Sequence, residues 1–330
     1  MNIPRTVWAL GLVSMCMDIS SEMIHSLLPL FLVSVLGAGA TAVGLIEGAA
    51  EGVSLVARSF SGVLSDRLGR RKPLALAGYG LGALTKPLFA MATGAGLVFA
   101  ARFADRIGKG VRGAPRDALI ADATPAEARG AAYGLRQSLD TVGAFLGPLL
   151  AMALMLATSG NYRTVFWVAV LPGLAAVAIL ALAVREPEAR TPGSLRPAVS
   201  LRDTGQLDAA YWGVVAFGAL FTLARFSEAF LLLRAGDAGL PASLTPAVLV
   251  AMNVVYAFTA YPAGLLSDRF GRSGPIAAGL AALTAADLML AAGGGVWMLA
   301  GGVALWGLHM GFTRGVLEIA GSKKLKLRSS

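Results

Sequence analysis

Five basic side chains interrupt an otherwise apolar stretch of this chain at helical spacing. They are Arg102, Arg106, Lys109, Arg112 and Arg116, at steps of 4, 3, 3 and 4 residues. Such steps place all five near one stripe of a single helix. Guanidinium and ammonium groups can bind an anion directly or tune the protonation of nearby carboxylates. The stripe therefore predicts a site for a charged solute or an exchangeable proton.

Carboxylates that could pair with this stripe have a regular spacing of their own. The candidates are Asp18, Glu22, Glu47, Glu51, Asp105 and Asp117. The first four form two pairs, each four residues apart, so each pair shares one face of its helix. Ionisable groups inside a membrane span are costly, so they face a bundle interior or a wet cavity and usually pair. We expect Arg102 and Arg106 to lie in such a network, whereas Arg116 could instead be a solvated charge at the membrane interface.

One histidine extends the first acidic pair. His25 follows Glu22 by three residues and lies on the same side of the helix as Asp18. An Asp/Glu/His face of this kind can bind a divalent metal or relay protons. A hydrogen-bonded histidine that serves only packing is the alternative. We predict a substrate or proton pathway here, with no bound metal and no cofactor.

Long apolar segments must position these charges. The 330 residues are 56% hydrophobic and only 14% charged, whereas soluble domains carry about 25% charged residues. Runs of about 20 apolar residues can cross the ~30 Å hydrocarbon core of a bilayer. We expect ten spans, at roughly 7–36, 41–63, 73–92, 95–120, 131–157, 163–184, 209–233, 243–265, 274–293 and 296–319. The predicted fold class is an all-α polytopic membrane protein.

The chain also contains an internal repeat. Gly62-Val-Leu-Ser-Asp66-Arg67-Leu-Gly69-Arg70 recurs as Gly264-Leu-Leu-Ser-Asp268-Arg269-Phe-Gly271-Arg272. Ser21-Glu22 recurs as Ser227-Glu228, and Arg112-Gly113 recurs as Arg314-Gly315, in the same order. A repeat of whole helical bundles is typical of secondary transporters.

The repeated loop carries a family resemblance. Residues 62–71, with Lys72 directly after them, match the pattern G-x-L-[SA]-D-R-x-G-R-[RK], and on them the chain resembles the major facilitator superfamily (MFS). The resemblance implies transport by alternating access, with spans one and four on a central cavity. It also implies a conformational latch made of Gly62, Asp66, Arg67, Gly69 and Arg70, with a second copy at Asp268, Arg269 and Arg272. Arg102 resembles the basic residue of the family's fourth-span motif, but Arg106 stands where that motif has its first glycine.

The fifth span carries a second resemblance. Gly143, Gly147 and Pro148 match the G-x-x-x-G-P motif found in antiporters of the family, although Ala151 stands where the next glycine is expected. Close helix packing with a bend is the alternative function of these residues.

These signals together predict four segments. Residues 1–184 form a six-helix N-terminal bundle, 185–208 a cytoplasmic linker, 209–320 an incomplete C-terminal bundle of about four helices, and 321–330 a basic polar tail. Counterparts of spans five and six do not follow Arg314-Gly315, so the chain looks truncated beside a twelve-span member; a natural ten-span variant is the alternative. In a truncated bundle we expect Asp287 and His309 to be exposed to lipid, and Asp66 to lack its helix-end partner.

Charge asymmetry predicts the orientation. Arg67, Arg70, Arg71 and Lys72 crowd one loop, and the other basic loops fall on the same side of the membrane. By the positive-inside rule this side and the N terminus are cytoplasmic. The net charge of +9 is then a topology signal and does not indicate nucleic-acid binding. We expect a monomer in a bacterial inner (plasma) membrane.

The predicted function is secondary active transport of a small solute, with proton-coupled efflux as the first hypothesis. One alternative is an organic or inorganic anion transporter in which Arg102, Arg106 and Arg112 bind the charge. A second alternative is a non-transporting remnant or assembly partner. The sequence has no nucleophile–base set, zinc frame or dinucleotide fingerprint, so we do not expect an enzyme. Its single cysteine, Cys16, lies inside an apolar span and provides no disulfide framework.

Overall fold

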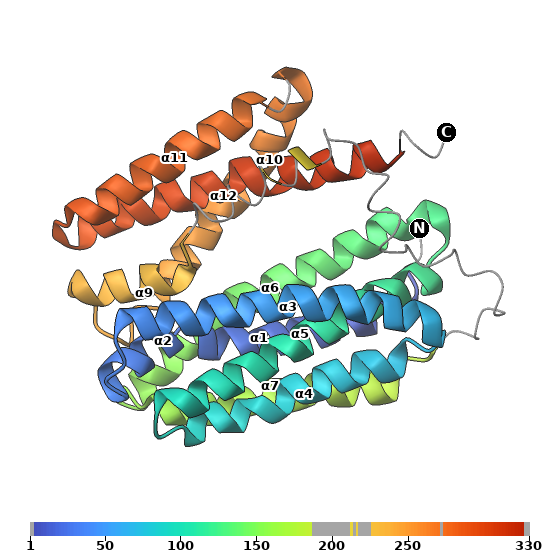
Figure 1. Cartoon of the computed structure of the whole chain (residues 1–330), viewed down its shortest axis with the longest axis horizontal. Coiled ribbons are helices and arrows are strands. Elements are labelled where there is room, and N and C mark those ends of the chain that lie inside the picture. Colours follow the sequence, from blue (N-terminus) through green and yellow to red (C-terminus); the bar gives the residue numbers. More distant parts are fainter. Residues whose placement is uncertain (1–2, 187–211, 214–215, 217–225, 271–272, 327–330) are drawn as a thin grey trace. The chain divides into compact units, whose positions relative to one another are not determined.

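The computed structural model describes residues 3–186, 212–213, 216, 226–270 and 273–326 (Figure 1). Every regular element among these residues is helical, as the fold class predicts. The first helices are α1 (Arg5–His25), α2 (Leu28–Leu30), the π-helix η1 (Phe31–Val35), α3 (Ala40–Leu68), α4 (Lys72–Met91) and α5 (Ala95–Ala123). They are followed by the 3₁₀ turn η2 (Ala126–Ala128), α6 (Arg129–Ala157) and α7 (Tyr162–Ala183). The later helices are α9 (Glu228–Asp237), α10 (Ala247–Phe270), α11 (Ser273–Ala292) and α12 (Gly295–Lys326).

Eight helical segments in the described part of the chain are long and apolar enough to cross a membrane, with lengths from 19 to 32 residues. They coincide with eight of the ten expected spans. The expected fourth span is the 29-residue helix α5, which carries too many charges to qualify on apolar composition. The expected seventh span, 209–233, lies largely outside the described residues.

The first span differs from the continuous helix expected over 7–36. α1 ends at His25, and the chain continues through Ser26 and Leu27 into α2 and η1. Pro29 explains the break, because it has no N–H to donate to the carbonyl oxygen of His25 four residues earlier. The Leu27 N–H instead closes a tighter turn on the carbonyl oxygen of Ile24, at 3.1 Å.

Residue contacts divide the chain into two compact units. Unit 1 comprises Met1–Gly147 and Asn161–Phe230, and unit 2 comprises Pro148–Gly160 and Leu231–Ser330. The predicted linker 185–208 and the tail 321–330 fall mostly where backbone or side chains are not described, so the four-segment division stays a prediction.

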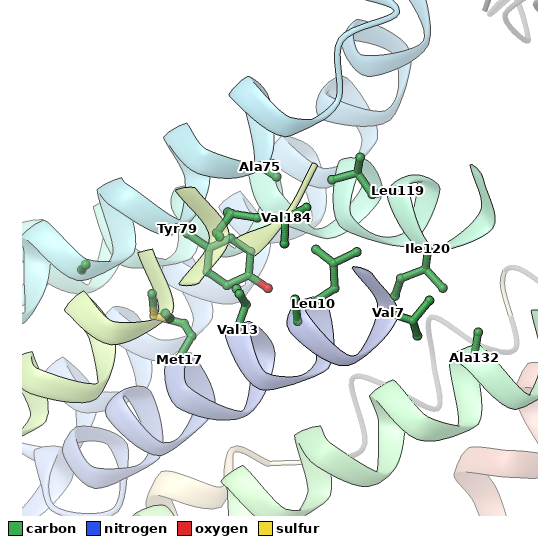
Figure 2. Close-up of a cluster of buried hydrophobic side chains, with 14 residues drawn as sticks. Val7, Leu10, Val13, Met17, Ala75, Tyr79, Leu119, Ile120, Ala132 and Val184 are labelled. Carbon is green, nitrogen blue, oxygen red and sulfur yellow. The ribbon is translucent and has the colours of Figure 1, made fainter. Parts of the chain in front are cut away.

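An apolar cluster holds the helices of unit 1 together (Figure 2). α1 contributes Val7, Leu10, Val13 and Met17, which pack against Tyr79 of α4. Leu119 and Ile120 of α5, Ala132 of α6 and Leu180 of α7 complete the buried group. α5 packs along α3 and α4, and α7 packs along α1 and α4. This framework fixes α5 between two neighbours.

In unit 2, α12 packs along α10 and α11. His309 of α12 is fully buried, and its Nδ1 lies 2.8 Å from the carbonyl oxygen of Gly279 in α11. The expectation that His309 is exposed to lipid is therefore wrong. Gly279 allows α12 to approach closely enough for the imidazole to reach that carbonyl oxygen. Asp287 is partly buried.

Candidate functional site

Glycines let α5, which carries the basic stripe, lie close to both neighbours. A Cβ added at Gly110 would lie 2.5 Å from the carbonyl oxygen of Ser54 in α3. A Cβ added at Gly108 would lie 2.7 Å from the carbonyl oxygen of Gly78 in α4. Small residues at helix crossings permit this backbone approach in membrane proteins. The charged side chains of α5 can therefore reach partners on both sides.

Two ion pairs join α5 to α3. Arg102 Nη2 lies 2.5 Å from Glu47 Oε2, and Arg106 Nη2 lies 3.0 Å from Glu51 Oε1. The two pairs follow one another at a step of four residues on each helix, which means that α3 and α5 run in the same direction. Both arginines are buried, whereas Glu51 is exposed. The two successive ion pairs, Arg102–Glu47 and Arg106–Glu51, are called the ladder below. Only the Glu51 side chain of the ladder is exposed.

A third ion pair joins α5 to α4 through a residue that sequence analysis missed. Lys86 Nζ lies 2.8 Å from Asp105 Oδ1 and 3.0 Å from the Ser21 hydroxyl of α1. The Thr85 hydroxyl also lies 3.5 Å from the same carboxylate oxygen. A lysine inside an apolar span is itself a signal of a functional site, and it could have been found on that ground.

The acidic face of α1 meets this pair. His25 Nε2 lies 3.9 Å from Asp105 Oδ2, and His25 Nδ1 lies 3.7 Å from Glu22 Oε1. The structure therefore brings His25 and Glu22 together with Asp105 of the basic helix. Among the described residues, no group of three or more His, Cys, Asp and Glu side chains is arranged to hold a metal ion.

Helix α6 supports the same acidic face. A Cβ added at Gly143 would lie 2.7 Å from the carbonyl oxygen of Met15 and 3.0 Å from Asp18 Cβ. A Cβ added at Gly147 would lie 2.6 Å from Glu22 Cβ. Both glycines therefore allow α6 to contact α1 where its two carboxylates project, and Pro148 follows directly inside α6.

A cation–π contact and two hydrogen bonds connect the middle of α5 to its C-terminal end. The Arg112 guanidinium lies over the Tyr79 ring, 4.8 Å from its centroid, in a cation–π contact. The Tyr79 hydroxyl lies 3.1 Å from the Ser14 hydroxyl, which accepts from Arg116 Nη1 at 3.0 Å. Arg112 and Arg116 are thereby connected through side chains of α4 and α1. Lys109, the remaining member of the stripe, is exposed.

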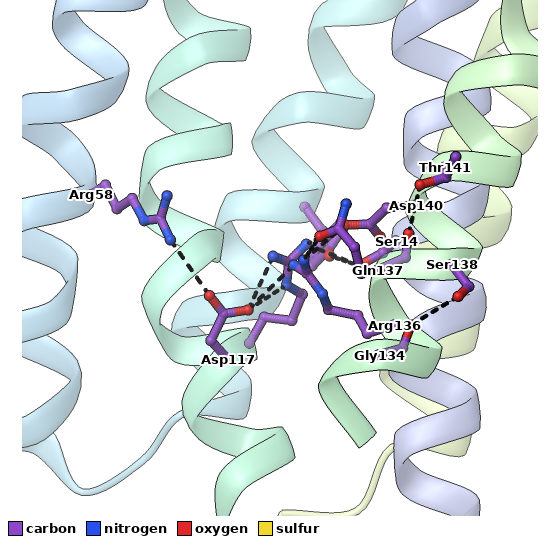
Figure 3. Close-up of polar contacts among 11 residues, drawn as sticks. Ser14, Arg58, Asp117, Gly134, Arg136, Gln137, Ser138, Asp140 and Thr141 are labelled. Atoms are coloured by element: carbon purple, nitrogen blue, oxygen red, sulfur yellow. Dashed lines mark hydrogen bonds and ion pairs between the residues drawn. The ribbon is translucent and has the colours of Figure 1, made fainter. Parts of the chain in front are cut away.

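A second charged network surrounds Asp117 near the end of α5 (Figure 3). Asp117 lies 3.0 Å from Arg116 Nη2, 3.5 Å from Arg136 Nη1 of α6 and 3.6 Å from Arg58 Nη2 of α3. Arg136 Nη2 also lies 3.3 Å from Asp140 Oδ2. The Arg116 side chain is only 14% exposed, so it belongs to this network and is not a solvated interfacial charge. The network ties α3, α5 and α6 together.

The first copy of the repeated loop follows the C terminus of α3. Gly69 ends the helix in the left-handed conformation, with φ of 62°, which glycine adopts without steric strain. Arg71 then lies between two carboxylates, 3.1 Å from Asp122 Oδ2 and 4.0 Å from Asp66 Oδ1. Asp66, Arg67 and Arg70 are exposed. In the second copy, the side chains of Asp268 and Arg269 and the whole of Arg272 lie outside the described residues.

Glu186 is a further residue of this region that sequence analysis missed. Its Oε1 accepts hydrogen bonds from the backbone N–H groups of Arg71, at 2.5 Å, and Lys72, at 3.1 Å. A carboxylate at the first turn of a helix satisfies free N–H groups and complements the helix dipole. Glu186, which follows the C-terminal end of α7, therefore caps α4.

This architecture matches one family across nearly its whole length. Residues 10–327 match the description "Major Facilitator Superfamily". The chain is 31% identical over 326 residues to an uncharacterised protein of Mycobacterium tuberculosis, a match that covers 95% of this chain and 77% of that protein. It is 29% identical over 290 residues to an uncharacterised MFS-type transporter of Methanocaldococcus jannaschii, covering 84% of this chain and 70% of that one. The chain belongs to the major facilitator superfamily.

Solved structures agree on the fold. A bacterial homolog of the human lysosomal transporter Spinster, crystallised in an inward-facing and unoccupied conformation, superimposes with a TM-score of 0.70 at 18% identity. The match covers 94% of this chain and 75% of that one. The same homolog in an inward-facing and occupied conformation also gives a TM-score of 0.70. The protein is thus a multi-pass membrane protein of a transporter fold.

Proposed function

We propose that this protein moves a small solute across the membrane by alternating access, coupled to protons, in the direction of efflux. The observation that carries the proposal is the set of buried ion pairs along α5, which binds α3, α4 and α1 to one charged helix. Placing several charges inside a membrane protein is costly and is typical of substrate and proton pathways.

Glu22 is the proton carrier that we favour among the four candidate carboxylates. Glu47 and Glu51 already pair with Arg102 and Arg106. Glu22 instead lies 3.7 Å from His25, whose charge depends on its own protonation. A carboxylate beside an imidazole can exchange a proton with it, because one ring nitrogen can accept a proton while the other donates one.

An anion transporter is the second candidate, and a specific observation favours it. Arg102 Nε and Nη1 and Arg106 Nε are buried and have no hydrogen-bond partner among the described residues. Unsatisfied buried donors are rare and call for a ligand or water. A carboxylate or phosphate group of a solute could accept from both guanidinium groups.

The second copy of the repeated loop supplies the proposed latch, through Asp268. We propose that the N terminus and both loops are cytoplasmic, and that the chain works as a monomer in a bacterial inner membrane. The basic residues gathered near these loops support this orientation.

Reconstitution tests the proposal. The purified chain is placed in liposomes that contain a pH-sensitive dye, and a panel of organic cations, neutral solutes, citrate and inorganic phosphate is offered under an imposed pH gradient. Solute movement with a matching proton flux supports the first candidate. Movement of citrate or phosphate without a proton flux supports the second, and no movement of any solute supports the non-transporting alternative.

A further inference from the structure

Lys86 is a buried cation to which neither candidate function assigns a role. Its side chain has no exposed surface, and its ammonium group bonds Asp105 Oδ1 at 2.8 Å and the Ser21 hydroxyl at 3.0 Å. It projects from α4 one residue before Pro87, inside an apolar helix. A structural ion pair at this depth gains little stability, because desolvation offsets most of the Coulomb attraction.

Lys86 is the inner end of a line of four titratable groups on three helices. The line continues from Lys86 to Asp105 of α5, then to His25 and Glu22 of α1, with separations of 2.8, 3.9 and 3.7 Å. Side-chain exposure rises along it, from 0% at Lys86 to 3% at Asp105, 12% at His25 and 29% at Glu22. The line thus connects a fully buried amine to a partly exposed carboxylate.

We propose that Lys86 is a proton-carrying residue and that Asp105, His25 and Glu22 form its relay to the accessible face of the bundle. This inference rests on the proton coupling proposed above and extends it to a residue in a different helix. Lysine suits the role because its ammonium group can lose a proton inside a protein, whereas a guanidinium cannot.

The transfer balances in protons and charge. Lys86 gives a proton to Asp105 Oδ1, and the carboxylic acid group of Asp105 rotates so that this same proton faces His25 Nε2, which accepts it. His25 then gives its Nδ1 proton to Glu22 Oε1. Lys86 ends as a neutral amine and Glu22 as a neutral carboxylic acid, while Asp105 regains its charge and His25 changes tautomer. The two longer gaps shorten, or a water molecule bridges them, at the moment of transfer.

Charged neighbours favour this route over storing an extra proton at Asp105. Arg102, Arg106, Lys109 and Arg112 of α5 face the line, as do Asp18 of α1, Glu47 of α3 and Glu228 of α9. An added proton on Asp105 alone would leave the Lys86 ammonium without its counter-charge among these cations. Transfer from Lys86 to Glu22 leaves the total charge of the cluster unchanged.

Proton counting on the full chain in lipid nanodiscs tests the proposal without knowledge of the solute. Potentiometric titration between about pH 5 and about pH 10 gives the protons bound per chain. We expect Lys86→Arg to release about one proton fewer than the wild type across this range, because arginine keeps its charge, and therefore its proton, throughout. Lys86→Gln, which keeps a hydrogen-bonding group at this position, serves as a second variant if the arginine does not fit. Lys72→Arg, in the same helix, is the matched control and should leave the proton count unchanged.

A pH-jump experiment tests the relay itself. After a jump from about pH 8 to about pH 10, a range in which an imidazole is neutral, replacing His25 by Asn should slow proton release about 100-fold while leaving the number of protons released unchanged, since a positioned acid–base group of this kind accelerates transfer by about that factor. Equal proton counts in the wild type, Lys86→Arg and Lys86→Gln would overturn the proposal, as would an unchanged release rate in His25→Asn. Absence of any proton flux in the liposome assay would instead reject the proton coupling on which the inference rests.

Discussion

Individual charged residues carry most of the functional information in this protein. The sequence offered Glu47 and Glu51 among six candidate partners of the basic stripe, and the structure pairs these two with Arg102 and Arg106 in that order. Lys86 escaped the same reasoning because it has no periodic companion, and its partner Asp105 lies on the next helix. Spacing along one helix reveals stripes, whereas a single side chain is matched to its partner only by tertiary packing.

Removal of Arg102 tests the ladder at this scale. Arg102→Ala leaves Glu47 as a largely buried carboxylate without its partner, which should cost about 3–5 kcal/mol of folding stability. Thermal denaturation in detergent should therefore show a markedly lower Tm. Arg58→Ala is the control, because the mostly exposed Arg58–Asp117 pair should contribute at most about 1 kcal/mol. Equal decreases in Tm for the two variants would show that the Arg102–Glu47 pair contributes no more stability than an exposed ion pair.

Glu22 provides a functional test at the same scale. Glu22→Gln keeps the size of the side chain but removes its exchangeable proton, so solute movement in liposomes should lose its dependence on the pH gradient. Glu127→Gln, at an exposed position of η2, should behave like the wild type. Retained pH-driven transport in Glu22→Gln would transfer the proton-carrying role to another carboxylate.

At the scale of helices, close crossings decide which charges meet. The sequence located the long apolar helices well, because hydropathy and length are local properties. It did not reveal the break between α1 and α2, although Pro29 was visible, since a proline inside a membrane helix can also be tolerated as a kink. It also did not show that Gly108 and Gly110 set two different crossings of one helix.

Gly110 makes the crossing of α3 and α5 testable. Gly110→Ala would place a Cβ 2.5 Å from the carbonyl oxygen of Ser54. Relief of that overlap requires a shift of one helix, which should cost about 1–3 kcal/mol and lower the Tm. Gly80→Ala in α4 is the matched control, because nothing lies within 4 Å of the added Cβ. A Tm of Gly110→Ala at or above that of Gly80→Ala would mean that the two helices do not approach so closely.

At the scale of the whole molecule, charge distribution predicts the orientation. In a Cys16→Ser background, single cysteines at positions 70 and 196 should react with a membrane-impermeant reagent only after the cells are opened, because both sites belong to loops predicted to be cytoplasmic. A cysteine at position 94, between α4 and α5, should react in intact cells. The opposite labelling pattern would invert the proposed topology.

The repeat and one loop pattern predicted the family, because a motif and its recurrence are visible directly in the sequence. Polar packing inside a bundle is different: His309 looked exposed from a count of spans, yet it binds a carbonyl oxygen within unit 2. A count of helices says how much surface must be covered, but not which side chains are covered.

The ladder between α3 and α5 has a consequence for helix alignment. Because its acids and bases repeat at the same step, a slide of four residues, about 6 Å, would still bring Arg106 to Glu47 or Arg102 to Glu51. By themselves, the ion pairs therefore determine which sides of α3 and α5 face each other, but they allow more than one axial position of α5 relative to α3. The Gly110 crossing and the hydrogen bond from the Ser61 hydroxyl to the carbonyl oxygen of Val111, at 2.5 Å, select one of these positions. Two uncharged contacts thus determine which acid each arginine meets.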